Sequence, residues 1–218
     1  MLRVRATFKK TGRAKYISHL DLNRCMLRTF RRSGLPIWYT EGFNPHPYYA
    51  FALALSLGFE SKCEILDFNI TDDDMPLDLI CEKLNTVMPE GMGVEKVALQ
   101  KQKITAIAKA EYGFSLVSSD VQGLFNAVQM LLAQPEINIE KKTKKGIKTV
   151  DIKPDTEILS CEMNGDSVDI RMYLPAGTQT NYNPTLFIEA LKNLTDIEFE
   201  ARNIQRLAIL CEDNSVFE

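Results

Sequence analysis

Apolar and polar residues alternate along residues 2–8, and this period of two predicts a β-strand with one buried face. A helix is expected next. Ser18 is a favourable N-cap with the acidic Asp21 three positions later, and the helix should run to about Ser33 and stop at Gly34. The first part of the chain therefore predicts a strand followed by a capped helix.

The rest of the first hundred residues continues this order. Strands are expected at about 35–40, 48–57, 63–70 and 94–99, with a second helix between Asp72 and Met88. With some subdivision of the strands in the middle, the resulting order is β-α-β-β-α-β, the ferredoxin-like split βαβ pattern. Residues 100–109 are small and polar, which is typical of a junction.

A similar order is predicted after the junction. The expected elements are a strand at 112–117, a helix at 121–133, strands near 137–140, 148–152, 157–162 and 168–174, a helix from Asn183 to Leu194, and a strand at 199–210. We therefore expect an α+β protein of two ferredoxin-like (βαββαβ) halves, residues 1–100 and 109–218, with antiparallel sheets and helices packed on one face.

The first predicted helix separates apolar and charged residues. Leu22, Met26 and Phe30 share one face of the helical wheel, which should face the core. Four arginines fall on the opposite side: Arg24, Arg28, Arg31 and Arg32. This arrangement predicts an exposed ridge of arginines.

The charge of the whole chain hides a strong asymmetry. The 218 residues carry a net charge of −3, but residues 1–49 hold ten basic residues against Asp21 and Glu41, a local charge of +8 that leaves −11 elsewhere. The basic residues are Arg3, Arg5, Lys9, Lys10, Arg13, Lys15, Arg24, Arg28, Arg31 and Arg32. The concentration favours a polyanionic partner, with a solvated basic face as the alternative.

Several classes of protein are excluded by composition. No uncharged apolar run reaches about eighteen residues, so no membrane span is expected. Basic residues interrupt the start of the chain, which excludes a signal peptide and predicts a cytoplasmic location. The cysteines are Cys25, Cys63, Cys81, Cys161 and Cys211. They are scattered, so they are expected to be buried thiols and not zinc or iron–sulfur ligands.

Both histidines of the chain lie in the basic segment. His19 lies in the first turn of the arginine-bearing helix, and His46 lies in the proline-flanked loop Gly42–Pro47. The nearby residues expected to bind nucleic acid are Lys9, Lys10, Arg13, Lys15, Arg24, Arg28, Arg31, Arg32, Trp38, Tyr39, Phe43 and Tyr48. Basic residues interleaved with aromatic ones are what single-stranded RNA binding requires.

The same residues leave a catalytic alternative open. His19 and His46 are candidates to cleave RNA by acid–base chemistry, or to hold a metal ion together with Asp21 and Glu64. Neither arrangement has a diagnostic spacing, and the expected site contains no metal. No P-loop, dinucleotide fingerprint, nucleophile elbow or HExxH motif occurs, so no cofactor is expected.

A second basic run extends from Lys141 to Gly146. It has the pattern of a hairpin tip, and it either extends an RNA-binding surface or forms a solvated turn.

The motifs of the first 64 residues resemble a known family. They are Tyr16–Leu22, Arg31–Pro36, Gly42–Pro47, and Leu55–Gly58 with Glu64; looser matches are Val150–Pro154 and the helix start at Asn183. Together they resemble the radical SAM-linked protein family, a bacterial domain found beside or fused to a radical SAM protein. The family's Arg before the later proline is replaced here by Asn183.

The resemblance implies an accessory role with a radical SAM protein as partner, in the modification of RNA or of a translation component. We expect an RNA-binding module that is not catalytic on its own. The alternatives are a metal-independent RNA-processing enzyme using His19 and His46, and a protein-interaction domain that docks on an acidic partner.

Overall fold

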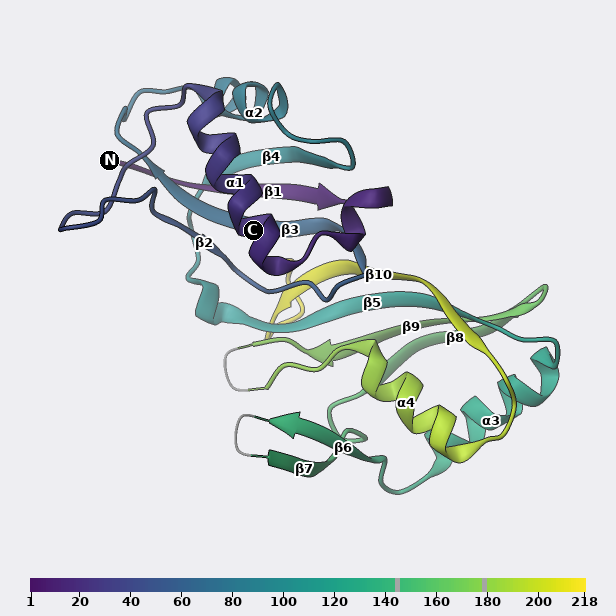
Figure 1. The fold of residues 1–218 in the computed structure, drawn as a ribbon. Coiled ribbons are helices and arrows are strands. Elements are labelled where there is room, and N and C mark those ends of the chain that lie inside the picture. The colour runs from purple at the N-terminus through teal and green to yellow at the C-terminus, as the bar shows by residue number, and fades with distance from the viewer. Residues whose placement is uncertain (144–145, 178–179) are drawn as a thin grey trace. The chain divides into compact units, whose positions relative to one another are not determined.

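The computed structural model describes residues 1–143, 146–177 and 180–218 (Figure 1). The chain forms two compact units. The first contains residues 1–106 together with the last five residues, 214–218, and the second contains residues 107–213. Each unit combines helices with antiparallel strands, so the protein is a mixed α+β protein.

The first unit has four strands and two α-helices within its described residues. Its elements are β1 (Leu2–Lys10), the 3₁₀ turn Gly12–Tyr16, α1 (His19–Ser33), β2 (Tyr49–Phe51), β3 (Glu60–Ile70), α2 (Leu77–Asn85), β4 (Met92–Leu99) and the 3₁₀ turn Ile104–Ala106. The strands pair antiparallel in the order β4-β1-β3-β2.

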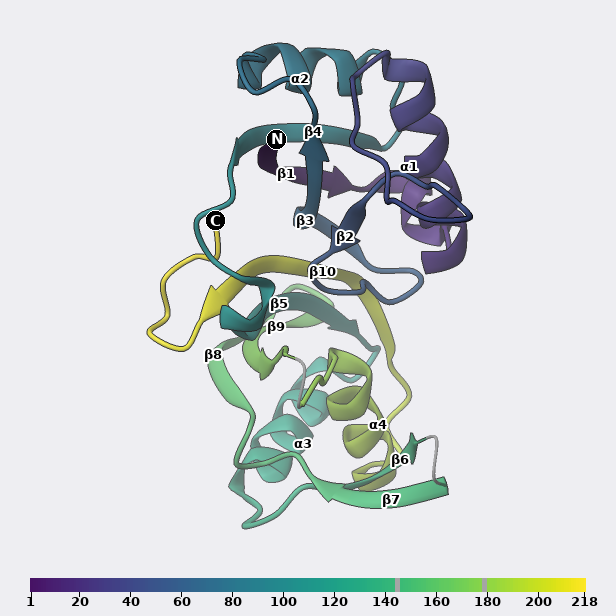
Figure 2. The same ribbon diagram turned by 90° about the vertical axis from the view of Figure 1, so that its left-hand side faces the viewer.

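Both helices of this unit cover the same side of its sheet (Figures 1 and 2). Val4, Ala6 and Phe8 occupy alternate positions of β1, are fully buried, and join one core cluster with residues of α1 and α2. Leu22 and Phe30 supply the α1 side of this cluster, as the helical wheel predicts. The opposite side of α1 is left to solvent.

The ends of α1 follow from local chemistry. The Ser18 side chain accepts a hydrogen bond from the Asp21 amide at 3.1 Å, and its hydroxyl donates to the Asp21 carboxylate at 2.8 Å. Gly34 ends the helix in the left-handed conformation, with φ of +64°. The predicted start and stop of this helix are confirmed.

The second unit repeats the strand order of the first with one addition. Its elements are β5 (Ile107–Val117), α3 (Val121–Ala133), β6 (Asn138–Thr143), β7 (Gly146–Asp151), β8 (Glu157–Asn164), β9 (Ser167–Pro175), α4 (Pro184–Leu194) and β10 (Glu200–Cys211). Its sheet runs β10-β5-β9-β8, all antiparallel. Counted along each unit, both sheets have the order fourth, first, third, second.

The addition is a separate hairpin. Among the described residues β6 and β7 pair with each other in a two-stranded sheet, where the sequence predicts strands near 137–140 and 148–152. Two of the basic residues predicted for its tip, Lys144 and Lys145, lie outside the described residues.

Two predicted strands of the first unit are corrected. Residues 35–40 form only isolated bridges at Ile37 and Tyr39, and the expected strand at 48–57 shrinks to Tyr49–Phe51. Pro36 and Pro47 have no amide hydrogen to donate to a strand ladder, which limits pairing on this side of the sheet.

The segment 214–218 packs on the first unit, whereas its position in the sequence groups it with the second half. Phe217 is buried, and the Arg5 guanidinium lies over its ring at 4.1 Å. Arg5 also forms a bidentate ion pair with Asp67, at 2.7 and 2.8 Å, and donates to the main-chain oxygens of Gln102 and Glu218. Arg5 is therefore an interior residue and not a surface cation.

Within the described ranges, no helix combines the length and apolar composition needed to cross a membrane.

Candidate functional site

The outer side of α1 carries the predicted ridge of arginines. Arg24, Arg28, Arg31 and Arg32 are all exposed. Three of them, spaced four residues apart, line a hollow of about 510 Å³: Arg24, Arg28 and Arg32. Its other wall is Val87–Pro89, the segment that follows α2, and half-buried Cys25 and buried Thr29 also line it. The ridge is thus the rim of a concave, basic surface.

Among the described residues, a carboxylate lies close to just one arginine of the ridge, the first. Arg24 pairs with Asp21 at 3.1 Å. Hydrogen bonds from Ser18 and then from Arg24 hold the pKa of Asp21 below its ordinary value, and Arg28 adds a longer-range attraction. Within the described part of the chain, no carboxylate lies at ion-pair distance from Arg28, Arg31 or Arg32. These three guanidinium groups give the surface its excess positive charge.

The thiol in the hollow is not an activated one. Burial raises the pKa of Cys25, an effect that the hydrogen bond to Thr29 and the charges of Arg28 and Arg32 only partly oppose. All five cysteines are thiols, but only Cys211 is buried and the other four are half-buried, which corrects the expectation that all are buried.

Two of the basic residues near the N-terminus of α1 that are predicted to bind nucleic acid are paired with carboxylates. Lys9 pairs with Glu95 and Lys15 pairs with Glu60, both at 3.5 Å. The Lys15 ammonium also lies 5.4 Å from the centre of the Tyr16 ring. Arg13 is exposed on the turn before α1. These pairs reduce the charge that the N-terminal cluster offers to a ligand.

Lys10 is removed from the predicted nucleic-acid contacts. Its side chain is 1% exposed, and its ammonium donates to the main-chain oxygens of Ile17, at 2.9 Å, and Lys15, at 3.4 Å. Lys10 lies on the same side of β1 as Phe8, two residues away, and so points toward the helices. These hydrogen bonds connect the turn before α1 to strand β1.

The predicted aromatic residues lie on a closed loop between α1 and β2. Within it, the Thr40 amide donates to the His46 main-chain oxygen at 2.9 Å, and the His46 amide donates to Thr40 Oγ1 at 3.2 Å. Tyr39 bridges Pro47 just outside this pair. Phe43, at the tip, is fully exposed.

The other three aromatic candidates are partly packed. Trp38 and Tyr48 meet edge to face with ring centres 5.6 Å apart at the base of the loop. Trp38 is half-buried, while Tyr39 and Tyr48 remain exposed. All four aromatic side chains therefore have some surface available, but only the Phe43 ring is open on all sides.

The two histidines have different surroundings. His19 is exposed, and its ring lies edge to face with the Phe51 ring, with the two ring centres 5.5 Å apart. His46 is exposed too, and its Nδ1 lies 3.1 Å from Thr40 Oγ1 and 3.0 Å from the main-chain oxygen of Asn44, so it closes the loop. Neither lines the arginine hollow.

The two acids named with the histidines lie in different settings, since Asp21 is exposed on α1 and Glu64 is buried in β3. Among the described residues, histidine, cysteine, aspartate and glutamate side chains nowhere gather in groups of three that would hold a metal ion.

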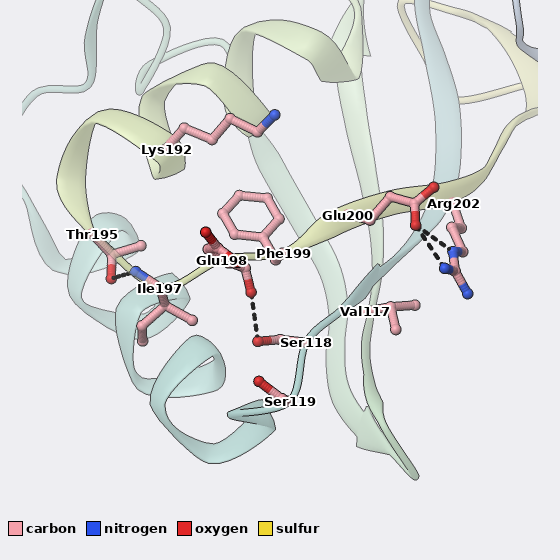
Figure 3. A pocket seen from close by; sticks show the side chains of 10 residues that line it. All are labelled: Val117, Ser118, Ser119, Lys192, Thr195, Ile197, Glu198, Phe199, Glu200 and Arg202. Carbon is pink, nitrogen blue, oxygen red and sulfur yellow. Dashed lines mark hydrogen bonds and ion pairs between the residues drawn. The ribbon is translucent and has the colours of Figure 1, made fainter.

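A second hollow lies in the second unit, and the sequence analysis does not identify it. It measures about 620 Å³ and is lined by Val117–Ser119, Lys192, Thr195, Ile197–Glu200 and Arg202 (Figure 3). Its formal charges cancel, since its lining contains two basic residues, Lys192 and Arg202, and two acidic ones, Glu198 and Glu200. Arg202 is bound to Glu200 at 2.9 Å, and the Ser118 hydroxyl donates to the Glu198 main-chain oxygen at 2.7 Å. The arginine hollow of the first unit is the more strongly charged of the two.

Comparison with known proteins gives a family but no activity. A family model described as "Uncharacterized protein conserved in bacteria (DUF2344)" matches residues 3–184. No curated protein matches the chain.

Two solved structures are distantly similar to this chain. One is a chain of the "Crystal Structure of a Cbf5-Nop10-Gar1 Complex", with 14% identity and a TM-score of 0.49; the match covers 95% of this chain but 49% of that one. This chain thus spans about half the length of that relative. The other is an unknown protein from Galdieria sulphuraria, with 11% identity, a TM-score of 0.28, and coverage of 92% of this chain and 96% of that one. Both likenesses are too distant to bear on function.

Proposed function

The chain belongs to the uncharacterised bacterial family DUF2344, and we propose that it is an RNA-binding accessory module. The arginine surface of α1 binds the phosphates of the RNA, and a separate enzyme acts on that RNA. The resemblance of the motifs in residues 16–64 to radical SAM-linked proteins supports a radical SAM protein as this enzyme. RNA modification or translation-related processing is the corresponding role.

The observation that carries the proposal is the unpaired charge on α1. Arg28, Arg31 and Arg32 are exposed on one side of a single helix, and Asp21 is the one carboxylate paired with the ridge among the described residues. Arginines four apart on a helix are separated by roughly 6 Å along its axis. A polyanion with regularly spaced charges satisfies several of them together, whereas a lone anion satisfies one or two.

The aromatic loop favours RNA over other polyanions. A flat, exposed ring and a row of guanidinium groups on the same unit match a ligand that has both charged phosphates and planar bases. A protein with an acidic surface would use the arginines but would have no particular use for the Phe43 ring. The geometry therefore supports RNA binding above the protein-docking alternative.

The nuclease alternative gains no support from the contacts of the histidines. The Nδ1 atom of His46 bonds within its own loop, and the His19 ring packs on Phe51. A general acid and base for RNA cleavage require imidazole nitrogens directed at one phosphodiester.

We also propose that each unit is a ferredoxin-like half. Both sheets have the order fourth, first, third, second with antiparallel neighbours. The second unit has the β6–β7 hairpin inserted after its first helix.

A charge-reversal experiment tests the proposed function. Arg28, Arg31 and Arg32 are replaced by Glu, and the affinity for a fluorescently labelled, mixed-sequence RNA is measured by anisotropy. The expected result is loss of binding with unchanged circular dichroism. In the matched control, three lysines that are exposed in the same unit but lie outside α1 are likewise replaced by Glu: Lys62, Lys101 and Lys103. This control should bind RNA nearly as well as the parent chain. Equal affinity of the α1 variant and its control would refute the proposal.

A further inference from the structure

The loop between Tyr39 and Pro47 presents one aromatic side chain in an unusual way. It is closed by two hydrogen bonds between Thr40 and His46, one between main-chain atoms and one from the His46 amide to the Thr40 hydroxyl, and the Phe43 ring at its tip is fully exposed. Apolar surface in water is unfavourable, and a flexible loop would be free to fold such a ring against the body of the protein. The closed loop holds the ring out instead.

From this geometry we propose that Phe43 stacks on an unpaired base, so that the module selects single-stranded RNA over duplex RNA. The inference rests on the proposed RNA-binding function and assigns a ligand class to the same surface. A stacking residue needs an open flat face, and Phe43 is the one aromatic candidate in the loop that offers both faces. In a duplex each base is already stacked between its neighbours, and its face is not available to a side chain.

The conformation of the tip supports this presentation. Gly42, directly before Phe43, has φ of +119°, a value that side chains other than hydrogen rarely allow. The residue that follows this turn, Phe43, is fully exposed. His46 stabilises the other side of the loop through contacts of its Nδ1 atom with Thr40 Oγ1 and the main-chain oxygen of Asn44. His46 is therefore a positioning residue for Phe43.

The loop emerges at the end of the first unit where α1 ends. After Gly34 the chain bridges from Ile37 to Ile70, the last residue of β3, and Trp38 donates to the main-chain oxygen of Asn69 at 2.9 Å. The loop then begins, so only a few residues of chain separate it from Arg31 and Arg32 in the last turn of α1. A single strand is flexible enough to place phosphates on these arginines and one of its bases on the ring.

The role of the ring differs from that of the charges in a measurable way. The arginines bind phosphates of single strands and duplexes alike, because both carry the same backbone charge. The ring contributes only where a base is unpaired. Replacing Phe43 by a residue without a ring should therefore lower the affinity for single-stranded RNA and leave the affinity for duplex RNA unchanged.

The experiment compares two probes with the full chain. One is an unstructured RNA of about 12 nucleotides, and the other is the same RNA annealed to its complement. Phe43→Ala is expected to weaken binding of the single strand roughly tenfold and leave duplex binding unchanged. Phe43→Trp, which retains a flat ring, should keep the parent preference. His46→Ala should lower single-strand affinity in the same direction by loosening the loop.

The outcomes separate this inference from the proposed function. If the parent chain binds neither probe, both fail. If it binds RNA through α1 but Phe43→Ala has no effect, or affects both probes equally, RNA binding stands and the stacking role is overturned. In the first of these cases the exposed ring would instead be a contact for a protein partner.

Discussion

Neutralising Arg28, Arg31 and Arg32 by substitution with Gln should flatten the salt dependence of RNA binding. The structure gives the number of charges that can contact phosphates. It is three, because these exposed arginines have no carboxylate at ion-pair distance among the described residues. Each phosphate neutralised on a single strand contributes roughly 0.7 to the slope of log K against log salt. Losing three such contacts should reduce the slope by about 2.

This change in slope is large enough to measure. Between roughly 50 and 200 mM salt, a slope difference of about 2 means that the parent chain loses about twentyfold more affinity than the variant. Fluorescence anisotropy with one labelled single-stranded RNA, repeated at several salt concentrations, supplies both slopes. Arg31 and Arg32 lie in the last turn of α1, where basic residues stabilise the helix by roughly 0.3–1 kcal/mol each, so the thermal midpoint is recorded alongside.

A control with the same change in net charge makes the result specific to α1. Lys62, Lys101 and Lys103 are exposed in the same unit, and their replacement by Gln should leave the slope within about half a unit of the parent value. Equal slopes for the α1 variant and the parent chain would mean that these arginines do not contact phosphates. The account of the site given above would then be refuted.

Three further predictions concern residues that stabilise the first unit. Lys10→Ala should lower the thermal midpoint without weakening RNA binding by the folded protein, since its ammonium serves main-chain oxygens and not the surface; weaker binding at an unchanged midpoint would contradict this. Ser18→Ala should cost about 1 kcal/mol in the free energy of unfolding and raise the pKa of Asp21, measured by NMR titration. Because the folded-state pKa of Asp21 is lowered, its stabilising contribution is present above its ordinary value and is lost as pH falls through the folded value. Asp67→Ala should cost about 3–5 kcal/mol by leaving the charge of Arg5 buried, whereas the double change Arg5→Met with Asp67→Leu should recover most of that loss in chemical denaturation.

The parts of the fold that the sequence predicts are those with local causes. Helix α1 begins at the residue after Ser18 and ends before Gly34, because a cap and a left-handed glycine act within a few residues of the chain. The alternation in β1 likewise identifies its buried side. The short β2 and the missing strand at 35–40 depend on proline positions and on pairing with β3. The β3 partners lie 15 to 19 residues after those of β2, and Ile70 lies 33 residues after Ile37.

For the site, the sequence locates the arginines but misjudges their neighbours. A helical wheel is enough to place Arg28 and Arg32 opposite the core. The burial of Lys10 is not visible in a charge count, because it depends on how β1 and the following turn pack. The hollow itself needs Val87–Pro89, a segment some sixty residues from the ridge, and no local pattern connects the two.

The partners of Arg5 become available in stages while the chain is being synthesised. Asp67 follows it by 62 residues and the main-chain oxygen of Gln102 by 97, but the oxygen of Glu218 follows only after 213, when the entire second unit has been made. A nascent chain that has just completed residue 106 therefore holds a first unit whose central guanidinium still lacks a main-chain acceptor and the Phe217 ring. The unit that carries the arginine ridge therefore obtains the last partners of Arg5 only after the second unit has been synthesised.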